Sequence, residues 1–311
     1  METTVKKRRL PFFTVVYIQM SFSFRAETKE LDEHTRTEAG GSFVPLTDGF
    51  THYELSNPDA KETVVLVHGF STPYFIYDPT FEFLTQSGFR VLRYDLFGRG
   101  FSDRPHTSYN IDLFVNQLSE LLEALRVTGT VNLVGLSMGG PITAAFTVCF
   151  SGQVKKLVLI DPAGTRPVLP SFALKVAAMP GIGETILHLV GRKGMVRNIA
   201  VDLFDRRYVE HFQSRYRVQM QYKGFRRAIL STVRHGMLGT FMDCYQQIGK
   251  MNKPVLLFWG RDDHTIPISH SSNLREIIPQ AEFHVIEHCG HIPHYEHAEE
   301  VNPILLEFLR R

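Results

Sequence analysis

Ser137 has the neighbours that a nucleophilic serine requires. It lies in the run Gly-Leu-Ser-Met-Gly-Gly at 135–140, directly after the apolar run 131–134. That run predicts a buried strand, and glycines two positions either side of the serine permit a turn so tight that larger side chains would collide. Because such a turn lifts the hydroxyl clear of the sheet, the pattern predicts attack by Ser137 on a carbonyl carbon.

A serine hydroxyl needs a base, and His291 is the histidine best placed to serve. It follows Gly290 in a segment near the end of the chain, directly after the strand-like run 282–286. A base that comes last, after the nucleophile and the acid, fits one known order of such triads. We therefore expect His291 to accept the proton of Ser137.

Three aspartates are candidates for the acid that orients His291. Asp262 and Asp263 are adjacent in the run Trp-Gly-Arg-Asp-Asp-His at 259–264, and neighbours in a loop point in different directions. Asp161 follows an earlier strand-like run and precedes a proline, so it can equally be a turn residue. The acid would hold one imidazole tautomer and stabilise the imidazolium that forms.

Two backbone amides are expected to stabilise the oxyanion of a tetrahedral intermediate. The N–H of Met138 follows the nucleophile, and the N–H of Phe70 lies in the run His-Gly-Phe-Ser after the strand-like segment 63–67. Gly69 lets the chain turn there. We interpret His68 as a buried hydrogen-bonding support rather than a catalytic group.

The sequence predicts neither a metal nor a cofactor. Four histidines recur at every third position near the chain end: His288, His291, His294 and His297. Zinc sites favour other spacings, and Pro293 opposes the helix that would align the four rings. The three cysteines are widely spaced, which predicts no disulfide framework and no zinc site: Cys149, Cys244 and Cys289.

Strand-like and helix-like segments alternate along the chain, as in a mostly parallel sheet with helices on both faces. A hairpin is expected over 43–46 and 51–55, and a helix over 110–125. Further buried strands are expected at 63–67, 90–94, 131–134, 156–160, 254–259 and 282–286. The predicted fold class is therefore α/β, with about eight strands.

About ninety residues separate two of these strands, too many for an ordinary crossover. We expect residues 165–250 to form a helical lid on a core of residues 42–164 and 251–311. Residues 166–250 hold 14 Lys or Arg against five Asp or Glu, a net charge of +9 that leaves −7 for the rest of a chain of +2. Such a lid could attract an anionic membrane surface or an acidic substrate, or could be a solvated face.

Residues 1–41 are expected to be an extension. Four basic residues at 6–9 precede an apolar stretch to residue 24, as in a signal or anchor segment, but polar residues and Pro11 dilute it. The polar residues 25–41 are typical of a linker. The sequence favours a cytoplasmic protein, with export or anchoring through residues 6–24 as the alternative, and the whole-chain charge gives no reason to expect nucleic acid.

Together these motifs resemble the α/β-hydrolase fold family over residues 42–311. The likeness includes the run Tyr-Asp-Leu-Phe-Gly-Arg-Gly-Phe-Ser-Asp at 94–103. It implies a triad of Ser137, Asp263 and His291, because the acid stands at the fifth position counted from Trp259. Within the family, the segments around Phe70, Ser137 and His291 are similar to monoacylglycerol lipases and small carboxylesterases.

The resemblance implies an esterase for small, apolar esters that works through an acyl-enzyme and needs no cofactor. Aromatic residues after Gly69 favour an apolar acyl pocket. Carbon–carbon bond hydrolases of ring-fission products share the pattern, although their oxyanion loop is usually richer in glycine than the run 70–73. A non-catalytic ligand receptor of the same fold is the third hypothesis.

Overall fold

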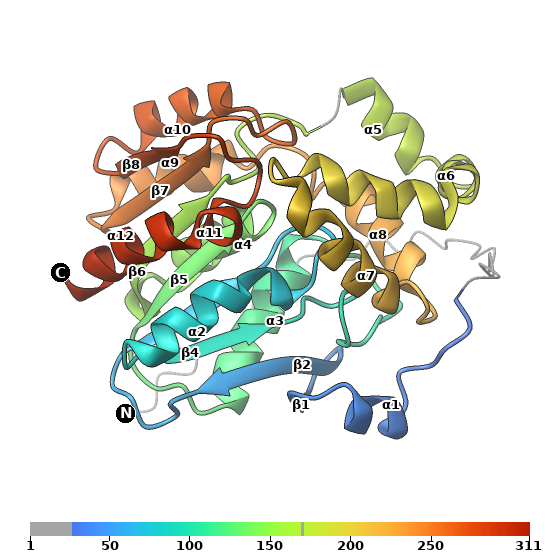
Figure 1. Cartoon of the computed structure of the whole chain (residues 1–311), viewed down its shortest axis with the longest axis horizontal. Coiled ribbons are helices and arrows are strands. Elements are labelled where there is room, and N and C mark those ends of the chain that lie inside the picture. Colours follow the sequence, from blue (N-terminus) through green and yellow to red (C-terminus); the bar gives the residue numbers. More distant parts are fainter. Residues whose placement is uncertain (1–26, 169–170) are drawn as a thin grey trace, which may run out of the picture.

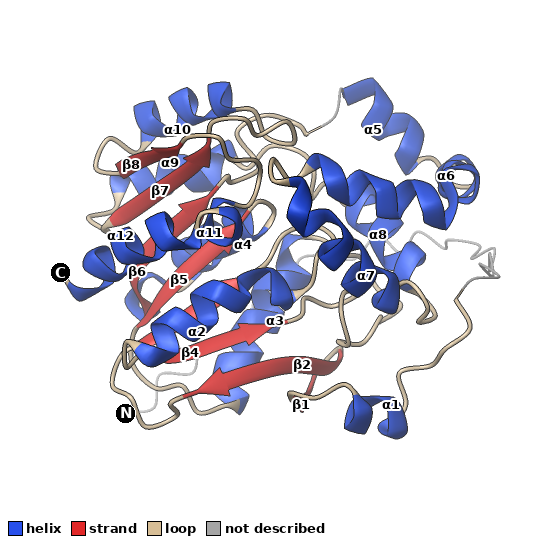
Figure 2. Ribbon diagram, in the orientation of Figure 1, coloured by secondary structure: helices blue, strands red, loops and turns tan. Residues whose placement is uncertain are grey.

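The structure is a computed structural model that describes residues 27–168 and 171–311, which fold around an eight-stranded sheet (Figure 2). In chain order the strands are β1 (Ser42–Leu46), β2 (Gly49–Ser56), β3 (Thr63–Val67), β4 (Arg90–Tyr94), β5 (Val131–Leu136), β6 (Val154–Ile160), β7 (Val255–Gly260) and β8 (Glu282–Ile286). Their order in the sheet is β1-β2-β4-β3-β5-β6-β7-β8. Only the β1–β2 and β2–β4 pairs of the described sheet are antiparallel, which confirms the predicted hairpin and mostly parallel sheet.

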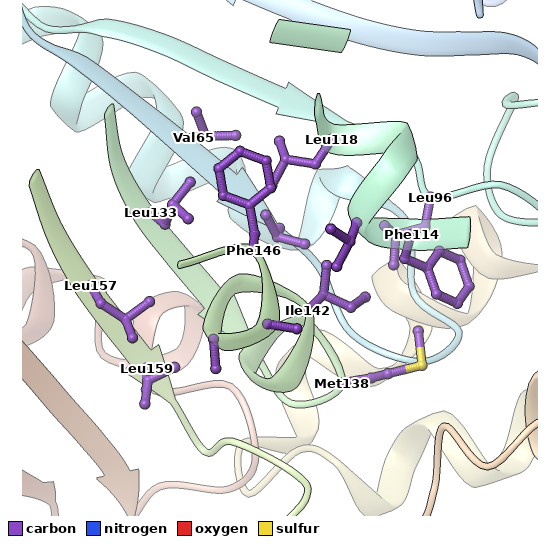
Figure 3. Packing of buried hydrophobic residues seen from close by; sticks show 14 of the residues in the cluster. Val65, Leu96, Phe114, Leu118, Leu133, Met138, Ile142, Phe146, Leu157 and Leu159 are labelled. Carbon is purple, nitrogen blue, oxygen red and sulfur yellow. The ribbon is translucent and has the colours of Figure 1, made fainter. Parts of the chain in front are cut away.

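Both faces of the sheet are buried, because side chains alternate between two apolar clusters along each central strand. Val65 and Leu133 belong to one cluster, and their neighbours Val64 and Val134 belong to the other. Figure 3 shows the first cluster, where Phe146 packs over the strands. This double burial explains why the sequence shows continuous apolar runs rather than alternation.

Helices cover the two faces. The first cluster includes residues of α3 (Ile111–Ala124), α4 (Gly139–Cys149) and α10 (Ser271–Ile277). The second includes residues of η1 (Tyr74–Tyr77), α2 (Asp78–Gln86) and α12 (Ala298–Arg310), and α11 (Pro293–Glu296) lies beside α12. Short 3-10 turns are η2 (Ser151–Gln153) and η5 (Ile268–His270). The predicted helix over 110–125 is α3, where the Asn110 side chain accepts a hydrogen bond from the Leu113 N–H and caps the first turn.

A helical insertion separates the neighbouring strands β6 and β7. It contains α5 (Ser171–Ala178), α6 (Ile182–Asn198), η3 (Ile199–Val201), η4 (Arg206–Tyr208), α7 (Val209–Gln219) and α8 (Phe225–Arg234). Figure 1 shows α5 to α8 grouped together to the right of the sheet. α9 (Met242–Lys250), which the sequence prediction assigned to the same lid, instead packs with α4: Tyr245 and Ile248 are buried in the first cluster, and the Tyr245 hydroxyl donates to the Ala163 carbonyl at 2.6 Å.

The segment before β1 also differs from the predicted linker, in its described part. The backbone N–H of Lys29 donates to the Gln221 carbonyl at 2.9 Å, and the Lys223 N–H donates to the Lys29 carbonyl at 2.9 Å. The buried Glu27 carboxylate accepts from the N–H groups of Gly224 and Arg226. After α1 (Glu33–Glu38) the chain enters β1. Residues 27–30 therefore bind the helical insertion.

The sequence prediction of a signal or anchor over residues 6–24 lies outside the described residues. Among the residues that are described, no helix is both long enough and apolar enough to cross a bilayer.

Candidate active site

Ser137 stands between β5 and α4 in the strained geometry that the sequence predicts. Its φ is +53°, a left-handed conformation that non-glycine residues seldom adopt. A Cβ on Gly135 would lie 2.5 Å from the Gly139 carbonyl oxygen, and one on Gly139 would lie 2.2 Å from the Val67 carbonyl oxygen. Neither contact is tolerable, so both glycines are required for the turn. The Ser137 side chain is left only slightly exposed at the carboxyl edge of the sheet.

The loop after β3 runs directly beside Ser137. A Cβ on Gly69 would lie 3.1 Å from the Ser137 Cβ and 3.5 Å from its Oγ. The backbone at Gly69, directly before the Phe70 amide, therefore lies against Ser137. Met138 follows Ser137 in the chain and is fully buried. These are the two residues whose amides the sequence predicts as oxyanion donors.

Two buried side chains hold this loop. His68 Nε2 accepts from the Leu96 N–H at 2.9 Å, so its Nδ1 carries the proton that is donated to the Gly69 carbonyl at 2.9 Å. Burial lowers the pKa of His68 to about 4, which keeps the ring neutral. Arg99 Nε donates to the Phe70 carbonyl at 2.8 Å. His68 was expected as a support, but sequence reasoning missed the role of Arg99.

Arg99 also joins this loop to the helical insertion. Its guanidinium donates to the Thr232 hydroxyl of α8 at 2.8 Å and to the Phe97 carbonyl at 3.1 Å. Burial lowers the pKa of Arg99 to about 10, so the side chain stays charged at neutral pH. One feature of the sequence could have pointed to Arg99: it stands between Gly98 and Gly100, and two such glycines permit a tight turn of the backbone.

His291 and Asp263 meet after β8 and β7. His291 Nδ1 lies 2.6 Å from Asp263 Oδ2 in a buried ion pair. The other Asp263 oxygen, Oδ1, accepts from the N–H groups of Thr265 at 2.7 Å and Ile266 at 2.9 Å. Those two bonds fix the carboxylate, which in turn fixes the imidazole so that Nε2 is the nitrogen left for a reacting proton.

The charge around His291 favours its protonated form. Burial alone would lower the pKa of His291, but the Asp263 carboxylate, through its charge and its hydrogen bond, outweighs burial and raises the pKa above its ordinary value. Asp202 and Glu296 add smaller contributions in the same direction. The environment thus suits a group that must accept a proton during the reaction.

The rival acid, Asp161, lies in the same site. One oxygen of Asp161, one of Asp263 and a ring nitrogen of His291 all fall within 4.8 Å of one another. Asp161 Oδ1 accepts from the Gly260 N–H at 2.9 Å, and the side chain is fully buried. Burial, reinforced by the charge of Asp263, raises the pKa of Asp161 well above its ordinary value. Asp161 is therefore a carboxyl group whose environment favours the protonated form.

Within the described residues, that trio is also the one group of histidine, cysteine and carboxylate side chains close enough to share a metal ion. The neighbouring histidines do not extend it. His294 is fully buried, its ring lies tilted against that of Tyr77, and burial lowers its pKa to about 3. His297 is hydrogen-bonded through Nε2 to the His288 carbonyl oxygen at 3.1 Å.

Glu296 is a further residue that sequence reasoning missed. Its carboxylate accepts from the N–H of Phe204 at 2.7 Å, of Asp205 at 3.1 Å and of Gly290 at 3.1 Å. The His291 N–H donates to the Asp202 carbonyl at 2.8 Å. A stretch of the helical insertion, residues 202–205, is thereby bonded to the loop that carries His291. No motif marks Glu296, because all its partners are backbone groups.

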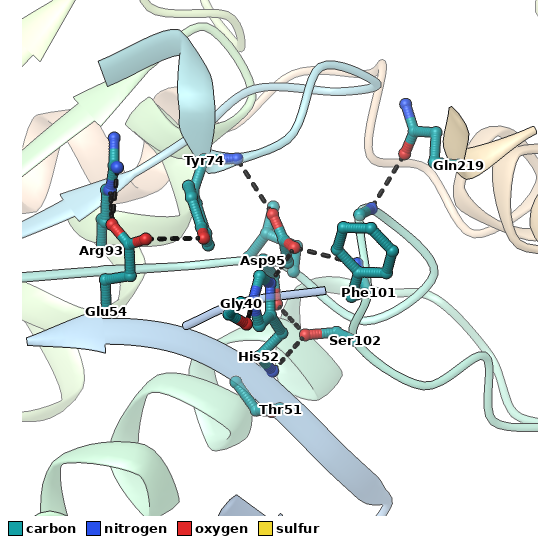
Figure 4. Close-up of polar contacts among 12 residues, drawn as sticks. Gly40, Thr51, His52, Glu54, Tyr74, Arg93, Asp95, Phe101, Ser102 and Gln219 are labelled. Carbon is teal, nitrogen blue, oxygen red and sulfur yellow. Dashed lines mark hydrogen bonds and ion pairs between the residues drawn. The ribbon is translucent and has the colours of Figure 1, made fainter. Parts of the chain in front are cut away.

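A second polar cluster supports the loop that carries Arg99 (Figure 4). The buried Asp95 carboxylate accepts from His52 Nδ1 at 2.8 Å and from the backbone N–H groups of Tyr74 and Phe101. A Cβ on Gly100 would fall 1.9 Å from an Asp95 oxygen, so the close approach requires glycine. These bonds satisfy the buried carboxylate and order the turn between β4 and α3.

Solved structures with a similar fold include hydrolases of two kinds. A meta-cleavage product hydrolase from Pseudomonas fluorescens IP01 is 24% identical, with a TM-score of 0.72 over 88% of this chain and 98% of that chain. An esterase from Exiguobacterium antarcticum is 19% identical, with a TM-score of 0.74 over 88% of this chain and 100% of that chain. At these identities the likeness supports the fold alone.

Curated relatives are similar over most of their length. A 2-hydroxy-6-oxononadienedioate/2-hydroxy-6-oxononatrienedioate hydrolase of Cupriavidus pinatubonensis is 29% identical over 88% of this chain and 96% of its own. A hydrolase of the same name from Pseudomonas putida is 28% identical over 86% of this chain and 95% of its own. The sequence model of the alpha/beta hydrolase family matches residues 64–304, which contain all three triad candidates. This chain belongs to the alpha/beta hydrolase family.

Proposed function

We propose that this chain is a serine hydrolase in which Ser137 is the nucleophile, His291 the base and Asp263 the orienting acid. The observation that carries the proposal is the 2.6 Å contact between His291 Nδ1 and Asp263 Oδ2, at the same sheet edge as a serine with a φ of +53°. An imidazole oriented by a carboxylate and a serine hydroxyl at a strained turn are what nucleophilic catalysis requires.

In the proposed reaction, Ser137 Oγ attacks a carbonyl carbon while His291 Nε2 takes its proton. The oxyanion is stabilised by the N–H groups of Phe70 and Met138. When the tetrahedral intermediate collapses, the electron pair of the breaking bond goes to the leaving group, which receives the proton from His291. Water then attacks the acyl-enzyme by the same steps and releases the acid.

We favour a carbon leaving group over an alcohol. This choice reverses the preference for esters that the sequence motifs suggested, and it rests on the relatives that are 28–29% identical over 86–89% of the chain. Their names describe hydrolases of an unsaturated dicarboxylate that carries a ketone. The proposed substrates are accordingly ketones of the ring-fission type, in which the leaving carbon can delocalise its electron pair.

Ester hydrolysis is the second candidate, and one observation favours it. The run Phe-Ser-Thr-Pro at 70–73, which follows Gly69, contains no glycine, whereas the oxyanion loops of carbon–carbon hydrolases are usually richer in glycine.

A comparison of two substrate classes tests the proposal. The full chain is assayed on a 2-hydroxy-6-oxo-dienoate and on a p-nitrophenyl ester series, with Ser137→Ala in parallel. We expect a higher kcat/KM on the ketone and loss of both activities in the variant. Faster turnover of the esters, still dependent on Ser137, assigns the second candidate. Turnover that survives in Ser137→Ala, or its absence from wild type on every substrate, overturns the serine mechanism; absence would favour a ligand receptor.

We further propose that α5 to α8 form the lid of this site. The support comes from the bonds that join residues 202–205 to the His291 loop and Thr232 to Arg99. The insertion is thus bonded both to the loop that carries His291 and to Arg99, which holds the loop of Phe70. Substitutions in these helices should therefore alter which substrates are hydrolysed.

A further inference from the structure

The outer helices of the insertion leave large apolar side chains in solvent. The exposed fractions are 79% for Phe172, 51% for Met179, 41% for Ile182, 37% for Ile186 and 78% for Leu189. A scattered exposed leucine needs no explanation, but five large apolar residues on α5, α6 and the turn between them form a concentrated set.

The spacing places three of these residues on one helix face. Ile182, Ile186 and Leu189 stand at positions i, i+4 and i+7 of α6, which lie above one another along one side of an α-helix. Phe172 lies on the neighbouring helix α5, and Met179 lies in the turn between the two helices. Figure 1 shows α5 and α6 at the outer border of the molecule, away from the sheet. We call this set of five residues the α5–α6 face.

The same helices are basic. Lys175, Arg192, Lys193 and Arg197 are exposed. The single acid in the sequence 171–198 is Glu184, and its carboxylate is engaged by Arg234 at 2.7 Å and by the Gly181 N–H at 2.8 Å. An apolar face flanked by exposed cations is typical of a helix that lies in a membrane interface.

We propose that the α5–α6 face docks on an anionic lipid surface. The apolar side chains would enter the boundary between head groups and acyl chains, while the four cations would meet the lipid phosphates. The insertion would then lie on the membrane surface. The inference rests on exposure and charge, so it does not depend on the reaction assigned to Ser137.

Charge favours this occupant over two others. A second copy of the chain, paired through the same face by a two-fold axis, would bring cations against cations. The segment 1–26 contains five Lys or Arg and one Glu, so it too would be repelled. An anionic surface is the partner that complements the face.

Vesicle co-sedimentation of the full chain tests the proposal. We expect wild type to bind vesicles of phosphatidylcholine with phosphatidylglycerol, to bind pure phosphatidylcholine far less, and to be released by salt. Phe172→Ser with Leu189→Ser should lower binding by at least about tenfold, because two large apolar side chains no longer insert. Phe50→Ser, at an exposed phenylalanine on β2, is the matched control and should bind as wild type does.

A charge variant tests the second half of the claim. Lys175→Gln with Lys193→Gln should weaken binding to the anionic vesicles, whereas Lys250→Gln on α9 should leave it unchanged, since that exposed lysine lies on another helix. Circular dichroism melts confirm that each variant is folded. Absence of wild-type binding overturns the proposal, and so does wild-type binding in the Phe172/Leu189 variant, which would assign the contact to another segment. Light scattering that shows a dimer lost in that variant would also overturn it, in favour of a second copy.

Discussion

Two buried carboxyl groups, those of Asp263 and Asp161, lie close to His291. The Asp263 carboxylate lies 2.6 Å from the imidazole, whereas burial and the Asp263 charge raise the pKa of Asp161 well above its ordinary value. Two like charges this close would repel in a buried site, so one proton is retained by the pair. Environment thus separates the roles that residue type alone left open.

Substitution of each aspartate by asparagine distinguishes those roles. Asp263→Asn should lower kcat by about 10⁴-fold, because the amide favours the wrong imidazole tautomer. Asp161→Asn should cost less than about tenfold, because the amide oxygen still accepts from the Gly260 N–H and replaces a neutral acid. Steady-state kinetics on one substrate gives both values. The reverse order of effects would make Asp161 the acid of the triad.

The pH dependence of kcat/KM follows from His291. The base must be neutral to accept a proton, so activity is lost as pH falls through the pKa of His291. Because Asp263 raises that pKa, the acidic limb should have its midpoint above 6.5. In Asp263→Asn, burial remains without the opposing charge, and the midpoint should move to lower pH. An acidic limb that stays in place in this variant would show that another group controls it.

At the scale of elements, the bonds of Glu296 tie the insertion to the catalytic loop. Glu296→Gln replaces one acceptor oxygen by a donor that faces backbone N–H groups, which should cost about 2 kcal/mol of folding free energy. We expect kcat to fall by up to about 10²-fold, because His291 is less well positioned. The acidic limb of the pH profile should move slightly to lower pH, because the Glu296 charge adds to those that raise the pKa of His291. Thermal melts and kinetics measure the two effects.

Glu299→Gln is the matched control for that experiment, because the Glu299 side chain is exposed on the neighbouring helix α12. It should leave both Tm and kcat near the wild-type values. If Glu296→Gln behaves like this control, residues 202–205 are held by other contacts, and Glu296 does not position His291.

The tight turn between β5 and α4, where Ser137 lies, leads to a further prediction. Gly139→Ala places a Cβ against the Val67 carbonyl oxygen at 2.2 Å, so either β3 or α4 must shift. We expect a loss of about 1–3 kcal/mol in the free energy of unfolding, measured by urea denaturation. Gly152→Ala meets no atom within 4 Å and should change stability by less than about 0.5 kcal/mol. Equal stability of the two variants would contradict the tight turn at Ser137.

Across the whole molecule, the sequence predicted the strands of the sheet better than it predicted how the N-terminal segment and the helical insertion pack. Each central strand is a short apolar run bounded by turn residues, and each predicted run falls on a strand of the structure within two residues. The α/β class follows from that rhythm. The positions of Ser137, Asp263 and His291 follow as well, because their motifs sit directly after strands.

What the sequence did not reveal depends on contacts between distant segments. Residues 27–30 bind the insertion through backbone groups and one carboxylate, which leave no periodicity to detect. The basic composition of 166–250 did not mark the point at which α9 rejoins the core. The closeness of Asp161 to Asp263 follows from the adjacency of β6 and β7, which is a property of strand order.

The central claim is that one serine of this chain is an activated nucleophile, and a covalent probe tests it without knowledge of the substrate. The full chain is incubated with a fluorophosphonate and analysed by intact mass and peptide mapping. We predict a single adduct, on the peptide that contains Ser137, which is absent in Ser137→Ala and formed far more slowly in His291→Ala. An unmodified wild-type chain, or an adduct that persists in Ser137→Ala, would contradict the account.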